Sequence, residues 1–213
     1  MARLSFAGSV ATLSEYAAFE ILCFSTSYLS TRHLAAQSIL TTTSIVVWHV
    51  PFSISVFSSN RVGHLVGAGL VGAARRAAVV HGVACLAAGC LSGAVTFLFR
   101  RESPRMFTDD ADVLNICAET IAAIAEAMLC GTNGMLRGLG RQSFAAYVVS
   151  GVNYLAVVPL SIWLMLGSPH WGLLGFWVGL PVGFWIIVCV QAVYMRAIRW
   201  EKCVDEGVVS TES

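Results

Sequence analysis

The sequence predicts an all-α, polytopic membrane protein with six transmembrane helices, and three observations support this prediction. Hydrophobic residues make up 57% of the 213 residues, charged residues only 12%, and the mean hydropathy is +0.75. Soluble domains average about 25% charged residues, so we expect most of these apolar side chains to face lipid. Six apolar runs reach the roughly 20 residues that a helix needs to cross about 30 Å of hydrocarbon. All 13 Lys and Arg residues lie outside those runs.

The predicted spans differ in their polar content. In order they are residues 4–29, 34–60, 77–99, 113–136, 143–166 and 171–195, within a membrane domain over residues 1–200 and before a cytoplasmic tail at 201–213. The first and fourth spans each contain two glutamates, and the other four contain no Asp, Glu, Lys or Arg. The second, fifth and sixth contain Pro51, Pro159 and Pro181. Each proline removes a backbone donor and permits a kink, although prolines are also common in membrane helices without a mechanistic role.

The distribution of basic residues predicts the orientation of the spans, because cytoplasmic loops carry an excess of Lys and Arg. One side of the membrane holds nine of the 13: Arg3, Arg61, Arg75, Arg76, Arg137, Arg141, Arg196, Arg199 and Lys202. The other side holds Arg32, Arg100, Arg101 and Arg105. Trp171 opens the last span, and Tyr194 and Trp200 close it, as expected for an aromatic belt. We therefore expect both termini to lie in the cytoplasm. We expect the protein itself to be an integral protein of the plasma membrane or the vacuolar membrane.

Several other classes of site are excluded. A formal net charge of +1 without a basic block argues against nucleic acid as a partner,. The seven cysteines form no C-x-x-C pair, so neither a metal site nor a redox motif is supported,. Gly67, Gly69 and Gly72 spell G-x-G-x-x-G, but the segment follows a membrane helix rather than a strand, so we reject dinucleotide binding. No catalytic constellation is present, so we do not expect an enzyme.

Glutamates within the spans are the main candidates for function. Such a residue costs about 2.5 to 3.5 kcal/mol at the centre of a bilayer and usually marks an ion or substrate path. At about 1.5 Å per residue, Glu15 and Glu126 both lie roughly 2 Å to the cytoplasmic side of the midplane. Glu20 and Glu119 lie about 5 and 8 Å to the outer side. The sequence thus predicts two tiers of carboxylates at matching depths on two helices.

Helical angles add a constraint. Glu119 and Glu126 are seven residues apart and share a face, whereas Glu15 and Glu20 are five apart and diverge by about 140°. We therefore expect one member of the second pair to face a cavity and the other to face a neighbouring helix. Clustered carboxylates in a low dielectric can exchange protons near neutral pH. A proton-coupled carrier requires such groups. A cationic substrate would compete with the proton for the negative charge of the carboxylates. The alternative is that some of these glutamates only form hydrogen bonds between helices.

Other polar residues within the spans carry weaker hypotheses. Asn153 and Tyr154 of the fifth span either line a cavity or form an interhelical hydrogen bond. His49 and His81 have no Cys or His nearby at metal-ligand spacing, so we interpret them as helix-interface residues.

Several motifs resemble the multidrug and toxic compound extrusion (MATE) transporters, from about Leu4 to Trp200. The first half of the chain contains Glu15-Tyr-Ala-Ala-Phe-Glu20-Ile, Leu34-Ala-Ala-Gln37-Ser, Pro51-Phe-Ser-Ile-Ser55, Arg61-Val-Gly63, Gly67-Ala-Gly69 and Ala73-Ala-Arg75. The second half contains Glu126-Ala, Asn133-Gly-Met-Leu-Arg137-Gly-Leu-Gly-Arg-Gln142, Asn153-Tyr154, Pro159-Leu and Trp171-Gly-Leu173. The pattern is closest to fungal and animal members.

The resemblance implies an antiporter that exports organic cations or xenobiotics in exchange for protons or sodium, with no cofactor beyond that coupling ion. It implies that Glu15, Glu20 and Glu126 occupy the family's acidic transport positions, whereas Glu119 has no clear counterpart. The match covers only the C-terminal six-helix lobe of a twelve-helix family. The chain is accordingly a fragment, a half-size protein that pairs with its own copy, or a partner of a separate N-terminal lobe. A non-transporting membrane scaffold stays open as an alternative.

Overall fold

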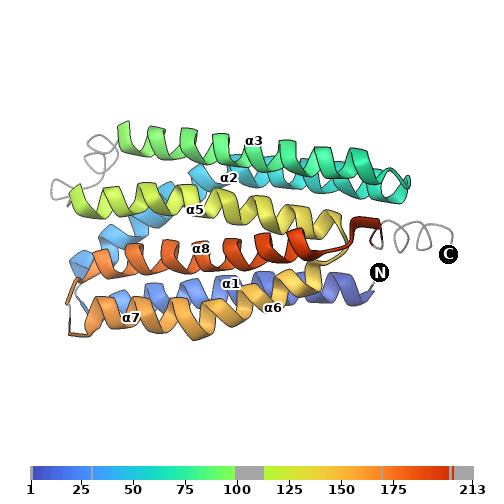
Figure 1. Cartoon of the computed structure of the whole chain (residues 1–213). Helices are drawn as coiled ribbons and strands as arrows, with labels where there is room; N and C mark the ends of the chain where they lie inside the picture. Colours follow the sequence, from blue (N-terminus) through green and yellow to red (C-terminus); the bar gives the residue numbers. More distant parts are fainter. Residues whose placement is uncertain (1, 30, 99–112, 169, 202, 204–213) are drawn as a thin grey trace.

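A computed structural model describes residues 2–29, 31–98, 113–168, 170–201 and 203 of the chain. Within these residues the chain forms six long helical segments and no β-strand. In order they are α1 (Ala2–Thr26), α2 (Thr31–Gly67), α3 (Val71–Leu98), α5 (Val113–Gly138), the continuous run of α6 (Gln142–Val152), η1 (Asn153–Val157) and α7 (Val158–Leu166), and α8 (Leu173–Ala197). Figure 1 shows an elongated bundle of these helices, with the start of α1 and the end of α8 at the same end. The predicted all-α class is therefore confirmed.

Each predicted span overlaps one helical segment. The largest difference between a predicted span boundary and the observed end of a helix is at the end of α2. This helix continues seven residues past the predicted boundary at Asn60. Arg61 ends the apolar run, but an exposed arginine is a good helix former. The chain turns only after Gly67, where Gly69 adopts a φ of 75°, a backbone conformation that favours glycine. The loop between residues 100 and 112 and most of the predicted tail at 201–213 lie outside the described residues.

Among the residues that the structure describes, three helical segments are long and apolar enough to cross a membrane, by length and composition alone. They are Val71–Val95, Gln142–Leu166 and Leu173–Ala197. The helices at the other three predicted spans have 25, 37 and 26 residues. The fold is nevertheless of a polytopic membrane class.

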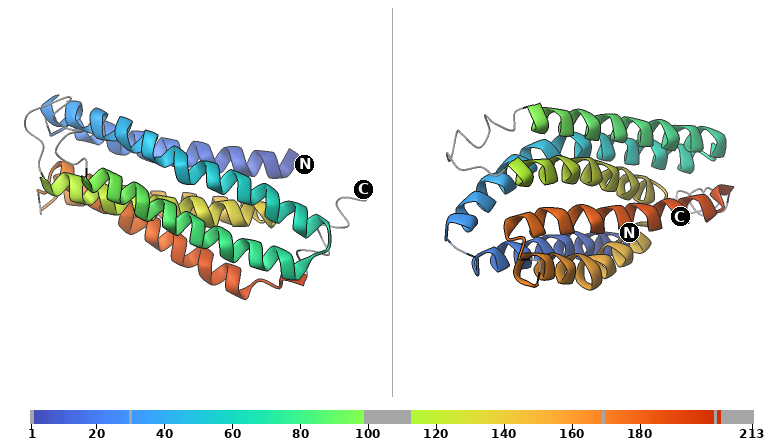
Figure 2. Two further views of the ribbon diagram at one scale, coloured as in Figure 1. Left: turned by 90° about the horizontal axis from the view of Figure 1, so that it is seen from above. Right: turned by 60° about the vertical axis from the view of Figure 1, so that its left-hand side comes forward.

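α5 is the central helix of the bundle. It packs against α2 and α3 on one side and against α8 on the other. α1 packs mainly against α6 and α7, and α7 packs against α8. α2 begins beside α1 and ends beside α3, so it links the two halves of the bundle (Figure 2).

The largest apolar core lies around α8. Phe176 and Trp177 of α8 are buried with Leu22 of α1 and Leu129 of α5. The ring of Phe19 meets the ring of Phe176 edge to face, with 5.7 Å between the centroids. These contacts place α1 and α5 on either side of α8.

Three glycines of α8 allow it to pack unusually close to the preceding helix. Gly175, Gly179 and Gly183 are spaced four residues apart and form one face, as in the small-residue interfaces of membrane helices. A Cβ at Gly175 would lie 2.6 Å from the carbonyl carbon of Leu164. A Cβ at Gly179 would overlap the Oγ of Ser161. The backbones of α7 and α8 approach closely because none of these positions carries a side chain.

Replacing Gly179 with alanine should therefore lower the free energy of unfolding by about 1–3 kcal/mol, as overpacking of a close interface does. Gly151→Ala is the matched control, because a Cβ at Gly151 on α6 meets nothing within 4 Å. Denaturation of the purified chain in detergent, followed by circular dichroism, measures the difference. Equal stability of the two variants would contradict the close packing of α7 against α8.

A π-helical turn interrupts the fifth span where the sequence predicts a proline kink. η1 covers Asn153–Val157 and ends two residues before Pro159, and the N–H of Val158 donates to the carbonyl of Asn153. Pro159 lacks an N–H and its ring crowds the preceding turn. The wider turn relieves that crowding while the flanking helices stay continuous.

Candidate functional site

Glu15 and Glu126 lie near the midpoints of two different helices. Glu15 is one residue past the midpoint of α1, and Glu126 lies at the midpoint of α5. Both side chains are half-buried, and they are close enough for their carboxylates to interact electrostatically. Arg137, further along α5, also acts electrostatically on Glu15. The structure therefore contains two acidic groups near the midpoints of α1 and α5 that interact electrostatically, and a basic group in the last turn of α5 that also acts on Glu15.

A polar stripe runs along one face of α5. Glu126, Cys130, Asn133 and Arg137 are separated by four, three and four residues, the spacing of side chains that share a helix face,. The stripe extends from the middle of α5 to its last turn. Because side chains of a helix point back toward its N-terminus, Arg137 reaches toward the glutamates.

The stripe contacts α8 through a residue that the sequence analysis did not single out. Gln191 is fully buried, with 0% of its surface exposed. Its Nε2 donates a hydrogen bond to Oδ1 of Asn133 at 2.8 Å. A single glutamine in a span that is otherwise apolar is the signal in the sequence that would have identified it.

Glu20 lies apart from the pair. Its side chain is exposed in this chain, and it interacts electrostatically with Cys23, three residues later on α1. Glu15 and Glu20 thus diverge around α1, as the helical angle predicts. Glu119 lies on α5, in a part of the helix whose side chains the structure does not describe.

Tyr154 forms an interhelical hydrogen bond near the acidic pair. Its hydroxyl donates to the backbone carbonyl of Ser14 at 3.2 Å, so η1 contacts α1 one residue before Glu15. Asn153 is 3% exposed and begins the π-helical turn. The sequence left two hypotheses for Asn153 and Tyr154, a cavity-lining role or an interhelical hydrogen bond. For Tyr154 the structure shows the interhelical hydrogen bond.

A second buried glutamine joins α1, α2 and α8. Oε1 of Gln37 accepts a hydrogen bond from Nε1 of Trp177 at 3.1 Å. Its Nε2 donates to Oγ1 of Thr41 at 3.2 Å and approaches Sγ of Cys23 at 3.8 Å. This network holds the first half of α2 against the apolar core.

The two histidines occupy different environments. Nε2 of His81 lies 3.1 Å from the carbonyl oxygen of Gly131, so this buried ring links α3 to α5. His49 is exposed, and its Nδ1 lies 2.6 Å from the carbonyl of Ile45 on its own helix. The interface role predicted for both is therefore seen for His81 and not for His49. In the part of the chain that the structure describes, no group of three or more His, Cys, Asp or Glu side chains is arranged to hold a metal ion.

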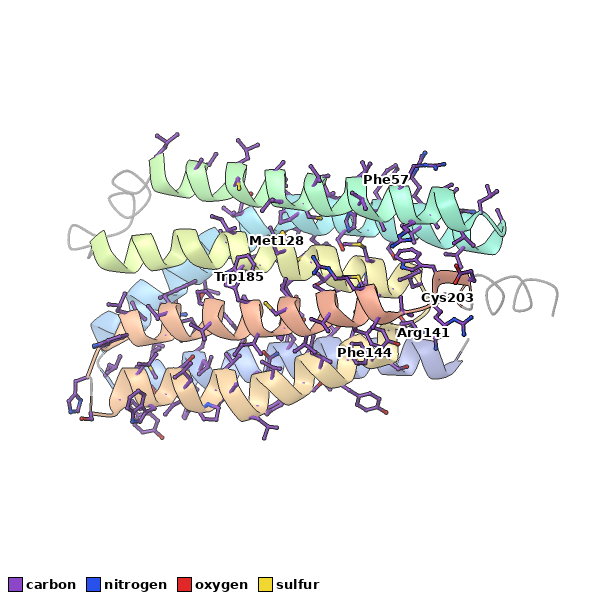
Figure 3. The ribbon with its side chains drawn as sticks, in the orientation of Figure 1. Phe57, Met128, Arg141, Phe144, Trp185 and Cys203 are labelled. Atoms are coloured by element: carbon purple, nitrogen blue, oxygen red, sulfur yellow. The ribbon has the colours of Figure 1, made fainter. Side chains whose placement is uncertain are left out.

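Side-chain contacts fix the end of α8 beside the turn that follows α5. The rings of Phe144 and Tyr194 stack with 3.7 Å between their centroids. Nη2 of Arg141 lies 3.9 Å from Sγ of Cys203. Figure 3 shows Arg141, Phe144 and Cys203 gathered at this end of the bundle. Gln191 is one turn of α8 before Tyr194, so the same contacts position it against α5.

Comparisons with known proteins agree on one family. The MatE family model matches residues 9–163. The chain is 33% identical over 210 residues to an uncharacterized transporter of Schizosaccharomyces pombe, covering 96% of this chain and 39% of that protein. It is 29% identical over 218 residues to human multidrug and toxin extrusion protein 1, covering 97% of this chain and 37% of that protein.

The fold also matches a solved structure. The crystal structure of the eukaryotic MATE transporter AtDTX14 superimposes with a TM-score of 0.89 at 23% identity, covering 98% of this chain and 48% of that one. At this identity the match establishes the fold alone. The chain therefore spans about two fifths of the length of these curated relatives and about half of the solved transporter.

Proposed function

The chain belongs to the MatE family of membrane transporters, and from this premise we propose that it forms one lobe of a secondary active antiporter. The antiporter exports organic cations or other xenobiotics across a membrane and takes up protons or sodium ions in exchange. No cofactor takes part beyond the coupling ion. The observation that carries the proposal is the placement of Glu15 and Glu126 near the midpoints of α1 and α5, where their carboxylates interact electrostatically.

The paired carboxylates supply the chemistry of exchange. Two like charges that interact in a low dielectric cannot both be ionised without a penalty. Binding a proton or a cation between them therefore relieves that penalty. A proton and an organic cation compete for the same negative charge, so the arrival of one favours the release of the other. This competition is the basis of antiport, because the two ligands bind alternately.

Glu20 supports the pair from the outer part of α1. It lies five residues beyond Glu15, roughly 7 Å further along the helix, and it is exposed in this chain. In the proposed transporter it forms an outer charge on the path of the cation. Asn153 and Glu119 are additional residues of that path, whereas Tyr154 forms the interhelical hydrogen bond to Ser14.

The proposed arrangement in the membrane follows from charge and shape. Nine of the 13 Lys and Arg residues fall on one side of the predicted spans, which supports a cytoplasmic position of both termini. The start of α1 and the end of α8 at one end of the bundle fit this orientation (Figure 1). We assign the protein to the plasma membrane or a vacuolar membrane. A second lobe, supplied by the rest of a longer protein, by another chain or by a copy of this one, completes the substrate cavity.

Efflux of a fluorescent organic cation should follow an imposed pH gradient. Vesicles that contain the assembled transporter are loaded with the dye, and the external medium is shifted to acid or to alkaline pH at constant sodium. We expect efflux in the direction opposite to proton flow, and its loss when a protonophore removes the gradient. Efflux that follows a sodium gradient instead would identify sodium as the coupling ion. Dye movement that is indifferent to both gradients would contradict antiport.

A further inference from the structure

The hairpin formed by α2 and α3 carries positive charge without any acidic residue. No Asp or Glu occurs at residues 21–101 of the sequence. Three arginines of the hairpin lie near the turn that joins its two helices, namely Arg61, Arg75 and Arg76. At about 1.5 Å per residue, Arg61 lies roughly 9 Å before the last residue of α2, and Arg75 and Arg76 lie roughly 6 and 8 Å past the first residue of α3. All three therefore lie at a similar level, near one end of the bundle.

These three guanidinium groups have no anionic partner in the part of the chain that the structure describes. All three side chains are exposed, and none forms an ion pair with a described residue. Val66 of α2, Ala74 of α3 and Leu139 after α5 share one apolar cluster, so the turn lies beside the end of α5. Glu201 is the only acidic residue described at this end, where the other exposed arginines are Arg137, Arg196 and Arg199. Positive charge therefore predominates here.

The arginines of α3 end a row of exposed apolar side chains, which we call the α3 stripe. Its members Val79, Val80 and Val83 have exposed fractions of 63%, 67% and 63%. Four residues separate Arg75 from Val79 and Arg76 from Val80, and residues at this spacing are neighbours on one helix face. The opposite face of α3 is buried against α2 and α5. The α3 stripe thus faces away from the bundle, with the two arginines at its end nearest the turn.

The guanidinium of Arg76 reaches away from the α3 stripe toward the end of the bundle. A Cβ at Gly72 would lie 3.9 Å from Nη1 of Arg76, so this side chain extends back over the first turn of α3. Basic side chains extend in this way when their stems lie along apolar surface and their charged heads lie in a polar environment. On α2, Phe57 is 67% exposed and lies one turn before Arg61. Both helices therefore change from apolar to cationic at a similar level.

An exposed apolar surface with a cationic end matches the chemistry of an anionic phospholipid. Guanidinium groups bind phosphate oxygens through two parallel hydrogen bonds, and acyl chains pack against apolar side chains. A soluble phosphate would contact the arginines but leave the α3 stripe uncovered. The uncompensated positive charge favours a headgroup with a net negative charge over a zwitterionic one.

We propose that Arg75 and Arg76 bind the headgroup of an anionic phospholipid whose acyl chains lie along the α3 stripe, with Arg61 adding positive charge at the same level. The cytoplasmic leaflet of a cell membrane contains the anionic lipids. The distribution of Lys and Arg predicts that this end of the bundle faces that leaflet. Binding of this lipid does not require antiport.

Native mass spectrometry of the 213-residue chain in a neutral detergent measures the binding. The chain is titrated with phosphatidylserine or with phosphatidylcholine of the same acyl chains, and the lipid molecules retained per chain are counted. We expect tighter binding of phosphatidylserine. Each basic residue near an anionic headgroup strengthens binding about fivefold. Arg75→Gln combined with Arg76→Gln should therefore lower the affinity for phosphatidylserine about 25-fold and leave that for phosphatidylcholine unchanged.

A matched pair of arginines provides the control. Arg100 and Arg101 are also adjacent in the sequence, and they lie in the predicted outer loop, outside the described residues. Replacing both with glutamine changes the net charge equally and should leave phosphatidylserine binding at the wild-type level. Circular dichroism compares the helix content of the variants. If the double variant of α3 does not fold, Arg76→Gln alone carries the test, with an expected loss of about fivefold.

Three outcomes would overturn the lipid site. The first is equal affinity of the wild-type chain for the two lipids. The second is an equal loss of phosphatidylserine binding in both double variants, which would indicate attraction by net charge alone. The third is displacement of phosphatidylserine by an equal concentration of glycerophosphoserine, the same headgroup without acyl chains, which would identify a site for soluble anions. Absence of gradient-driven efflux would count against antiport and leave the lipid site unaffected.

Discussion

Glu126→Gln in the assembled transporter should reduce gradient-driven efflux of an organic cation by about 100-fold or more, the lower range of effects for a group that transfers protons. Glutamine keeps the size of the side chain but removes its charge and its exchangeable proton. Without that charge, Glu15 alone faces the centre of the bundle. In the variant, a proton and a cation no longer compete for a carboxylate at position 126. The second negative charge that attracts the cation is also lost.

The measurement compares efflux with the amount of protein in the membrane. Glu201→Gln is the control, because Glu201 is exposed and lies after α8, outside the predicted spans. It should export at the wild-type rate. Membrane abundance of both variants is measured by immunoblotting, so that loss of transport is not confused with loss of protein. Normal efflux from Glu126→Gln would remove the acidic pair from the mechanism.

The acidic pair was predictable because it depends on quantities that a helix fixes. The rise per residue sets the depth of a side chain, and two spans of similar length place Glu15 and Glu126 at one level. The angle per residue separates Glu15 from Glu20. The structure adds the lateral arrangement, in which α1 and α5 lie on either side of α8. One-dimensional periodicity contains no information about which helices are neighbours, so the electrostatic interaction of the two glutamates could be identified only from the fold.

Other features were outside the reach of the sequence. The π-helical turn at Asn153–Val157 arises from crowding by Pro159, and the sequence indicated a kink without its form. The bond between Gln191 and Asn133 joins residues 58 positions apart. An apolar run with one glutamine indicates a buried polar contact but does not identify the partner. The extension of α2 to Gly67 was missed because the apolar run, rather than the helix, ends at Asn60.

A single copy of the 213 residues should move no organic cation, and a second lobe should restore transport. The chain spans 39% and 37% of the two relatives described above. The acidic pair is only half-buried, so it lacks the wall that a cavity between two lobes provides. Transporters of this general architecture place their substrate at the interface of two repeats and work by moving one repeat against the other. One lobe has no second body to move against.

Chain density in vesicles gives the decisive measurement. At fewer than one chain per vesicle, on average, we expect no dye efflux above protein-free vesicles, and efflux at that density would contradict the need for a second lobe. A homodimer predicts that activity per chain rises with chain density, and that mixing in Glu126→Gln reduces it further than dilution does. A separate N-terminal lobe predicts no activity at any density until that lobe is added. In that case Glu126→Gln lowers efflux only in proportion to its share of the chains, because each complex contains a single acidic pair.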